Sequence, residues 1–266
     1  MKSKPSVGAS LTSVFGEADV VLEIDNKSLT HRPDLWCHYG FARELSAILS
    51  RPLVRDLDAQ MGDSESANEV LSAFVTDNKK WKIEVDPDCG CRRFMAVELS
   101  GVVAEQSPFW LRHRLHSVGA GVRNKIVDLS NYVMLDVGQP NHTYDSDKLP
   151  ENKLHIRLAK EGESFSGLND TEYTISAQDV VVSSADTAVA LGGVLGGAST
   201  SVSEETKSIL FEAANWDPVR IRKTSVRLDA RTDASNRFEK SLSAINVPLG
   251  VWRYYELAKV LSLIHI

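Results

Sequence analysis

The most regular pattern of apolar and polar positions lies between residues 121 and 145. Apolar residues recur there at helical spacing, at Ile126, Leu129, Val133, Met134 and Val137. Gly138 is suited to end such a helix and Pro140 cannot continue it, so the pattern predicts a helix followed by a sharp turn. His142, Tyr144 and Asp145 follow directly. A histidine behind a rigid helix is a candidate functional group, although an ordinary helix end explains the same pattern.

Other stretches predict further helices and a set of short strands. Helical spacing predicts helices over residues 34–49, from Ser107-Pro108 to near Gly119, from Asp217-Pro218 onward, and over 247–263. Asp34 and Ser107 are the expected N-caps of the first two. Short alternating or β-rich runs predict strands over residues 20–24, 82–85, 93–100, 154–158, 173–175, 180–182, 188–191 and 208–213. Strands at about ten-residue spacing indicate a small barrel or a curled sheet.

Together these elements predict an α+β fold. It has a mixed sheet with packed helices and a small barrel-like β region, preceded by a small helix–strand segment. The expected divisions are a disordered lead-in (1–17), the helix–strand segment (18–55), a polar linker with a possible short helix (56–80), a larger domain (81–245) and the start of a truncated C-terminal helix (246–266). Both ends look cut, so we expect a fragment of a longer protein.

Composition narrows the class of protein. The 42% hydrophobic and 25% charged fractions are those of a globular domain. No apolar run approaches the roughly 18 residues of a membrane helix, and no signal peptide opens the chain, so a cytoplasmic location is expected. The net charge of −6 argues against a surface coated for nucleic acid. Cys37, Cys89 and Cys91 cannot all pair with one another, and no metal-binding spacing of histidine and cysteine is present.

Two further features have both a structural and a functional explanation. The glycine-rich run Leu191–Gly197 lacks the Gly-Lys-Ser/Thr ending of a phosphate loop, so a turn where two backbones approach closely is favoured over nucleotide binding. Glu212 stands among apolar residues of a predicted strand, either as a solvent-facing carboxylate at a sheet edge or as a placed functional group. Thr232 has the position of a helix N-cap, as does Ser235.

Four stretches in register resemble one family, the β subunit of bacterial phenylalanyl-tRNA synthetase. They are E-I-D-N-K-S-L-T-H-R-P-D-L, N-Y-V-M-L-D-V-G-Q-P-N-H-T-Y-D, A-L-G-G-V-L-G-G and L-F-E-A-A-N-W-D-P with R-T-D-A-S-N-R-F-E after it. Their order and spacing follow the family from about residue 18 to about residue 260. The oligonucleotide-binding-fold domain usual near the N-terminus of this subunit, and its later domains, have no counterpart in the sequence.

The resemblance implies a function for residues 81–245. In the family this α+β module edits, hydrolysing tyrosine misattached to tRNA-Phe, while the aminoacyl bond is made on the other subunit. The implied partners are tRNA-Phe, the synthetase α subunit in a heterotetramer of two α and two β chains, and tyrosine as editing ligand, with no membrane. No cofactor is expected in this fragment; ATP and Mg²⁺ serve the complete synthetase. The alternative is a non-catalytic scaffold that binds tRNA or the partner subunit.

Site residues follow from matching the family's motifs position by position. The resemblance implies catalytic roles for His142 and Asn131, no metal ligands, and substrate binding by Ser130, Gly196, Glu212, Thr232 and Ala234. The chain departs from the family motif G-Q-P-x-H-A-F-D, because Thr143-Tyr144 replaces Ala-Phe. The G-V-R-N-K-I-V-D segment is shorter than usual, which leaves the role of Arg123 open.

The chemistry expected of such a site is hydrolysis of an ester by water, assisted by positioning, with no metal and no covalent enzyme intermediate. Tyrosine and phenylalanine differ by one hydroxyl, so a synthetic pocket rejects the wrong one imperfectly and a second hydrolytic sieve is useful. A buried Glu212 would accept a hydrogen bond from the phenol and would be left unpaired by phenylalanine. His142 would orient the water or the terminal ribose, Asn131 would bind the ester or ribose, and Thr232 and Ala234 would leave room for the ring.

Overall fold

The computed structural model describes residues 6–10, 12–13, 20–63, 65, 67, 80–261 and 263. The predicted lead-in, the middle of the predicted linker and the last residues of the chain lie partly outside these ranges. The helices are α2 (His38–Leu49), α3 (Leu57–Gly62), α5 (Phe109–Ser117), α6 (Lys125–Val137), α7 (Pro218–Arg227), α8 (Asp233–Phe238) and α9 (Asn246–Val260). The strands are β1 (Lys82–Val85), β2 (Cys91–Ser100), β3 (Asn141–Asp145), β4 (Lys153–Leu158), β5 (Glu163–Ser166), β6 (Glu172–Ile175), β7 (Val180–Ser184), β8 (Thr187–Leu191), β9 (Leu195–Gly196) and β10 (Ser208–Trp216).

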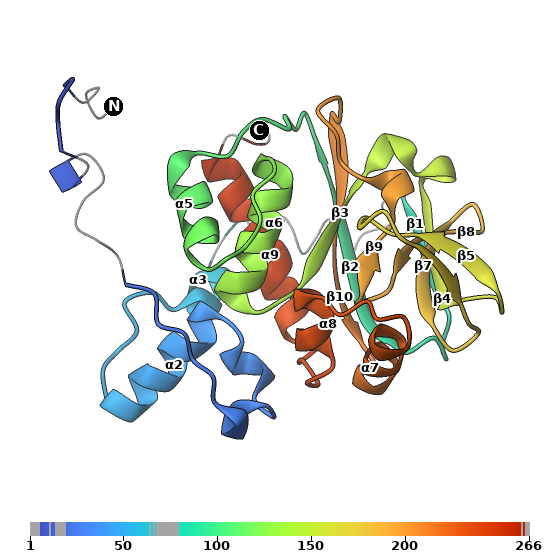
Figure 1. Ribbon diagram of the computed structural model, residues 1–266, viewed down its shortest axis with the longest axis horizontal. Helices are drawn as coiled ribbons and strands as arrows, with labels where there is room; N and C mark the ends of the chain where they lie inside the picture. Colours follow the sequence, from blue (N-terminus) through green and yellow to red (C-terminus); the bar gives the residue numbers. More distant parts are fainter. Residues whose placement is uncertain are drawn as a thin grey trace.

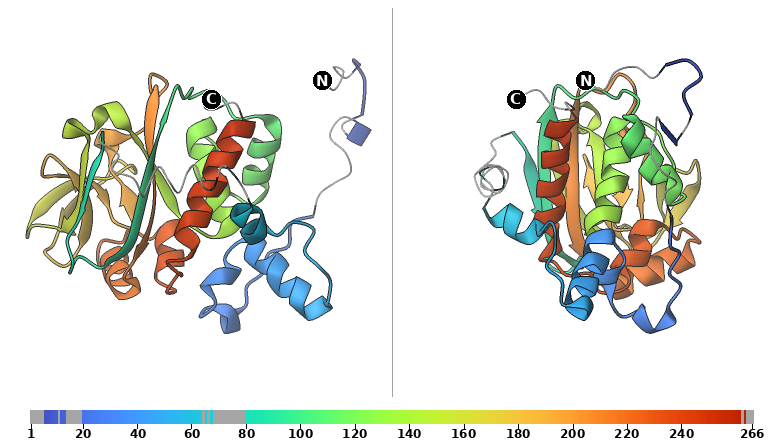
Figure 2. Two further views of the ribbon diagram at one scale, coloured as in Figure 1. Left: turned by 180° about the vertical axis from the view of Figure 1, so that it is seen from behind. Right: turned by 90° about the vertical axis from the view of Figure 1, so that its left-hand side faces the viewer.

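An antiparallel sheet of β2, β10 and β3, with β10 in the centre, divides the molecule. Helices α6 and α9 cover one face of this sheet, with α5 packed outside α6 (Figures 1 and 2). Successive residues of a strand point to opposite faces, so Ile209, Phe211 and Ala213 of β10 enter the core on the helical side. The ring of Phe211 stacks on Tyr254 of α9, with the ring centroids 4.1 Å apart.

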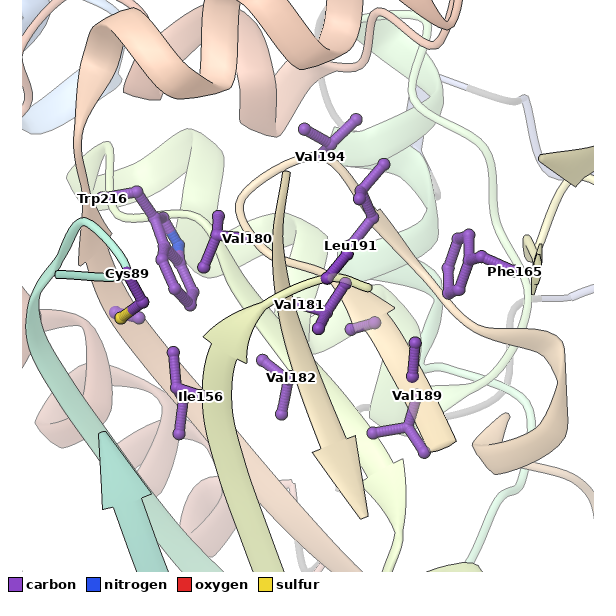
Figure 3. Packing of buried hydrophobic residues seen from close by; sticks show 14 of the residues in the cluster. Cys89, Ile156, Phe165, Val180, Val181, Val182, Val189, Leu191, Val194 and Trp216 are labelled. Carbon is purple, nitrogen blue, oxygen red and sulfur yellow. The ribbon is translucent and has the colours of Figure 1, made fainter. Parts of the chain in front are cut away.

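A second sheet lies on the other side of the first. Its strand order among the described residues is β1-β4-β7-β8-β9, and β1 is parallel to β4 while the remaining pairs are antiparallel. Val180, Val181 and Val182 of β7 are all buried, as expected of a strand covered on both faces. Trp216, at the end of β10, packs into the same cluster and ties the two sheets together (Figure 3).

This arrangement confirms the predicted α+β class and the mixed sheet. The second sheet does not close into a barrel within the described residues, because β1 and β9 stand at opposite ends of the strand order. The hairpin of β5 and β6 forms a separate small sheet beside it. Helix α9 packs against α6, β2 and β10, so it belongs to the same core as the sheet it covers. The divisions of the chain into domains stay predictions.

Two helix starts differ from the sequence prediction. Helix α2 begins at His38, where the Cys37 sulfur accepts a hydrogen bond from the Gly40 backbone N–H. Asp34 is instead engaged by the Arg32 guanidinium, with a shortest N–O distance of 2.7 Å. Helix α5 begins after Pro108, and the hydroxyl of Ser107 donates to the buried Asp128 of α6 rather than capping α5. Asp34 thus forms an ion pair instead of capping α2, and Ser107 bonds to a residue distant in sequence instead of capping α5.

The strand predicted over residues 20–24 is wrong. This stretch has no strand, and Val21, Leu22 and Ile24 are more than half exposed. A strand is stable only beside a partner, and no strand in the described part of the chain pairs with this segment. The segment before the linker has α2 and short 3₁₀ turns at Lys27–Leu29 and Pro33–Leu35, and α3 is the short helix expected within the linker.

The segment around α2 packs against the helical face of the larger domain. One ring nitrogen of His38 lies 3.0 Å from the carbonyl oxygen of Leu135 in α6. The Arg237 guanidinium donates to the carbonyl of Trp36 at 3.2 Å. The Cys37 side chain fits against Gly138, where a β-carbon would lie 3.0 Å from its sulfur. These contacts support the turn at which α6 ends.

Candidate active site

A cavity of about 430 Å³ lies between the two sheets, at the end of α6. Its walls come from β3, β10, the glycine-rich turn between β8 and β9, the loop before α6, and the N-terminus of α8. Six of the seven predicted site residues line it: Asn131, His142, Gly196, Glu212, Thr232 and Ala234. Segments far apart in the sequence thus meet at one hollow, as the motif matching predicts.

Strand register places the central polar side chains on one face. His142 of β3 lies directly opposite Glu212 of β10, and Tyr144 follows His142 by two residues. Because side chains alternate along a strand, all three project from the face that α6 and α9 leave uncovered. Glu212 lies on the central strand and is only 6% exposed, so the explanation as a solvent-facing edge carboxylate is wrong.

The turn after α6 fixes the register of β3. Gly138 ends the helix in the left-handed region at φ 77°, as the sequence predicts. The buried Gln139 then donates from its amide nitrogen to the carbonyls of Pro140 and Ala214, both at 2.9 Å. The second of these bonds ties the turn to β10. It holds His142 opposite Glu212.

The glycine-rich turn gives the histidine its space. A β-carbon on Gly196 would lie 2.3 Å from Cε1 and 2.8 Å from Nε2 of His142. A contact under 3 Å requires the ring to move, so the position of the imidazole depends on glycine here. A β-carbon on Gly192 or Gly193 would lie 3.1 Å or 2.7 Å from the Trp216 ring. These contacts confirm the prediction of a close-approach turn rather than a phosphate loop.

Glu212 is the buried acid of the cavity. Burial raises its pKa to about 7, and the hydrogen bond donated by the Tyr144 hydroxyl to Oε2 acts in the opposite direction. The pKa of Tyr144 is raised well above its usual value by burial and by the neighbouring carboxylate. Glu212 therefore titrates near neutral pH, with one carboxylate oxygen already bonded.

His142 is the base of the cavity, and the residue as a whole is half-buried. Burial lowers its pKa to about 4, so the imidazole is neutral at pH 7. Its Nε2 atom is buried and has no hydrogen-bond partner within the described residues. Buried polar atoms almost always have a partner, so this atom points to a water molecule or a ligand in the cavity. A neutral imidazole there is able to accept a proton or a hydrogen bond.

Three other predicted residues, Asn131, Thr232 and Ser130, differ in their relation to the cavity. Asn131 lines the cavity from α6. The Thr232 hydroxyl donates to the Val194 carbonyl at 2.8 Å and accepts from the Ser235 backbone N–H in a capping box, which confirms its N-cap explanation. Ser130 does not line the cavity, because its hydroxyl donates to the Asn141 side chain at 2.6 Å.

Arg123 stands outside the cavity lining. Its side chain is exposed, and its backbone N–H donates to Asp128 Oδ1 at 2.7 Å. Motif matching missed the Phe, Trp and Tyr side chains of the lining, which are Tyr144, Trp216 and Phe238. The strand period of two residues could have indicated Tyr144 and Trp216. Tyr144 is two residues from His142 and Trp216 is four residues from Glu212, so each lies on the same face as that site residue.

The described residues hold neither a candidate metal site nor a membrane-spanning helix. No group of three or more histidine, cysteine, aspartate or glutamate side chains gathers there in a way that suits a metal ion. Of the helices in those residues, none has the length and apolar character needed to cross a bilayer.

Known proteins match most of the chain. A family model described as the B3/4 domain matches residues 90–261. A phenylalanine–tRNA ligase beta subunit from Solibacter usitatus (strain Ellin6076) is 39% identical over 246 residues, which are 92% of this chain and 30% of the relative. Beta subunits from Thermotoga maritima and Clostridium tetani are 32% and 33% identical, over 96% and 98% of this chain and 31% and 32% of the relatives. The chain thus spans about three-tenths of the length of these relatives.

One solved structure has a low similarity to this chain. It is an N-terminal fragment of the phenylalanyl-tRNA synthetase beta-subunit from Pyrococcus horikoshii, with a TM-score of 0.39 and 14% identity, covering 78% of this chain and 60% of that chain.

Proposed function

This chain belongs to the B3/4 domain family, as found in phenylalanine–tRNA ligase β subunits, and on that premise we propose that its cavity edits aminoacyl-tRNA. The substrate would be tRNA-Phe carrying tyrosine, and the reaction hydrolysis of the ester. Making the correct ester would remain the task of the complete synthetase, with its α subunit, ATP and Mg²⁺. The cytoplasm, where tRNA is charged, is the corresponding location.

One observation carries this proposal above the others. A neutral histidine with an unpartnered buried nitrogen and a buried carboxylate stand opposite each other in one cavity. The cavity volume of about 430 Å³ falls in the range of roughly 300–1,000 Å³ found for small-ligand sites. An aromatic aminoacyl group fits this volume, and the polar pair lies on the same wall of the cavity.

The reaction needs only a positioned water. The water oxygen would attack the ester carbonyl carbon while His142 accepts a hydrogen bond, or its proton, at an imidazole nitrogen. The bond between that carbon and the ribose oxygen then breaks, and the proton ends on the ribose oxygen. The products are free tyrosine and tRNA with its terminal hydroxyl restored. Asn131 is placed on the cavity wall, where its amide would bind the ester or ribose.

Selection of tyrosine would rest on Glu212, which would accept the hydrogen bond of the substrate phenol. The expectation that phenylalanine leaves this carboxylate unpaired needs correction, because Tyr144 already donates to Oε2. Among the described residues no hydrogen bond reaches Oε1, and Glu212 lines the cavity. The substrate hydroxyl would therefore bond to Oε1.

Deacylation measurements test the proposal. The chain is incubated with tyrosyl-tRNA-Phe and phenylalanyl-tRNA-Phe, and loss of the aminoacyl group is followed with time. We expect hydrolysis of the tyrosyl ester to exceed that of the phenylalanyl ester, and His142→Ala to lower the rate about 100-fold, the usual scale of a general base. An undiminished rate in His142→Ala would refute the role of the histidine. Absent hydrolysis by a folded chain that binds tRNA would favour the scaffold alternative.

A further inference from the structure

The hydroxyl of Tyr144 is the feature of the cavity that the proposed reaction does not use. This side chain is fully buried, lines the cavity, and donates its hydroxyl proton to Oε2 of Glu212. Its ring meets the His142 ring edge to face, with the centroids 4.5 Å apart. The chain thus carries a phenol of its own at the carboxylate proposed to recognise a phenol.

The strand register explains how Tyr144 reaches this acid. Tyr144 pairs with Leu210 across the sheet, while Glu212 pairs with His142. Tyr144 and Glu212 are therefore diagonal neighbours, a separation of about 7–8 Å between backbones that a long aromatic side chain spans. Packing against His142 fixes the ring on that diagonal. The bond is therefore a consequence of the strand register.

We infer that Tyr144 is an internal occupant of the hydroxyl subsite and sets how strongly the cavity distinguishes tyrosine from phenylalanine. It supplies to Glu212 the phenolic donor that a tyrosyl ligand would otherwise supply alone. The inference rests on the proposed function, and it assigns to the cavity a broader ligand class. That class is aromatic aminoacyl groups with or without a para hydroxyl, with tyrosine preferred by a modest margin.

The argument depends on the cost of an unpaired buried acid. A site that binds a hydroxyl rejects a ligand lacking it mainly because its own polar group is then buried without a partner. Tyr144 removes part of that penalty, since Glu212 keeps one hydrogen bond when phenylalanine fills the cavity. Without the Tyr144 hydroxyl, phenylalanine would leave the carboxylate bare, whereas tyrosine would still pair with it.

Calorimetric titration of two non-hydrolysable ligands tests the inference on the full 266-residue chain. L-tyrosinamide and L-phenylalaninamide are titrated at pH 8 into the wild type, Tyr144→Phe and the control Tyr254→Phe. Tyr254 is equally buried, but its hydroxyl faces the backbone carbonyl of Ile126 in the other core. We expect Tyr144→Phe to raise the preference for tyrosinamide about tenfold, through weaker binding of phenylalaninamide. The control should keep the wild-type ratio.

The possible results separate the inference from the function on which it rests. General damage to the fold would weaken both ligands together, so thermal unfolding of each variant is measured alongside. A ratio that stays the same or falls in Tyr144→Phe overturns the role of Tyr144 while leaving the aminoacyl cavity in place. If neither ligand binds the folded wild type or the variant, the cavity is no aminoacyl site and both proposals fail.

Discussion

The two faces of the sheet formed by β2, β10 and β3 use the same strands for opposite purposes. On the helical face, Phe211 lies with Ile209 and Ala213 in an apolar core under α6 and α9. On the other face, Glu212, His142 and Tyr144 meet around a cavity. Phe211 and Glu212 are consecutive residues, and both are buried. The difference shows that strand alternation alone lets a rigid apolar layer support a polar site directly behind it.

The largest expected effect on stability comes from a substitution on the apolar face of the sheet. Phe211→Ala removes a ring that is fully buried and stacked on Tyr254, so we expect a loss of about 3–5 kcal/mol in the free energy of unfolding. Chemical denaturation measures this loss. The matched change one residue later, Glu212→Gln, keeps the side-chain volume and should cost far less at pH 5. Equal losses from the two variants would contradict the division between the faces.

A second prediction uses the titration of the polar face. The pKa of Glu212 is about 7 in the folded chain, whereas the ordinary pKa of a glutamate is 4.5. As the pH rises between these values, ionisation of Glu212 therefore favours the unfolded chain. The wild type should lose up to about 3 kcal/mol relative to Glu212→Gln between pH 4.5 and 7. Denaturation of both proteins at several pH values measures the difference. A stability difference independent of pH would mean that Glu212 is not buried as described.

His142 should produce the opposite slope. Its pKa of about 4 in the folded chain lies below the reference value of 6.5, so its contribution is lost as the pH falls through this interval. Replacement by asparagine should remove that acid-side loss, as seen in denaturation from pH 7 down to pH 4. Where the two intervals overlap, the contributions of Glu212 and His142 partly cancel in the wild type. Single variants are needed to expose them.

A smaller effect is expected from crowding the histidine. Gly196→Ala adds a methyl group that would lie too close to the His142 imidazole. We expect it to lower the free energy of unfolding by about 1–3 kcal/mol and to change the His142 ring signal in NMR spectra. Gly62→Ala is the control, because nothing lies near its added β-carbon. If both substitutions are neutral and the ring signal is unchanged, Gly196 does not position the histidine.

The smallest effect should come from Ser130. Its hydroxyl bonds to Asn141 and does not line the cavity, so Ser130→Ala should cost about 1 kcal/mol of stability. Tyrosinamide affinity should stay within about twofold, because no ligand contact is removed. A large loss of affinity without a loss of stability would restore the substrate-binding role that motif matching gave to this residue.

The sequence predicted those elements whose signals are local. The helical spacing before Gly138 and the helix start at Asp217-Pro218 depend on nearby residues, and both appear in the structure. The four motifs indicated the family because they occur in the family's order along most of the chain. The family model and the similar β subunits confirm that prediction.

Features that depend on distant partners were not predictable in this way. Residues 20–24 have the composition of a strand but lie beside no partner strand among the described residues. Ser107 has the chemistry of a cap, yet the buried Asp128 takes its hydroxyl. The bond from Tyr144 to Glu212 depends on the register between β3 and β10, which no local pattern specifies.

The central claim is that the polar face of the sheet binds an aromatic aminoacyl group with its ring toward Glu212. A crystal structure of the chain with L-tyrosinamide tests it most directly. The account predicts the ligand in the cavity, its phenol oxygen within hydrogen-bond distance of Glu212 Oε1 and its amide end beside His142. A ligand bound elsewhere, or one with its phenol directed away from Glu212, would contradict it.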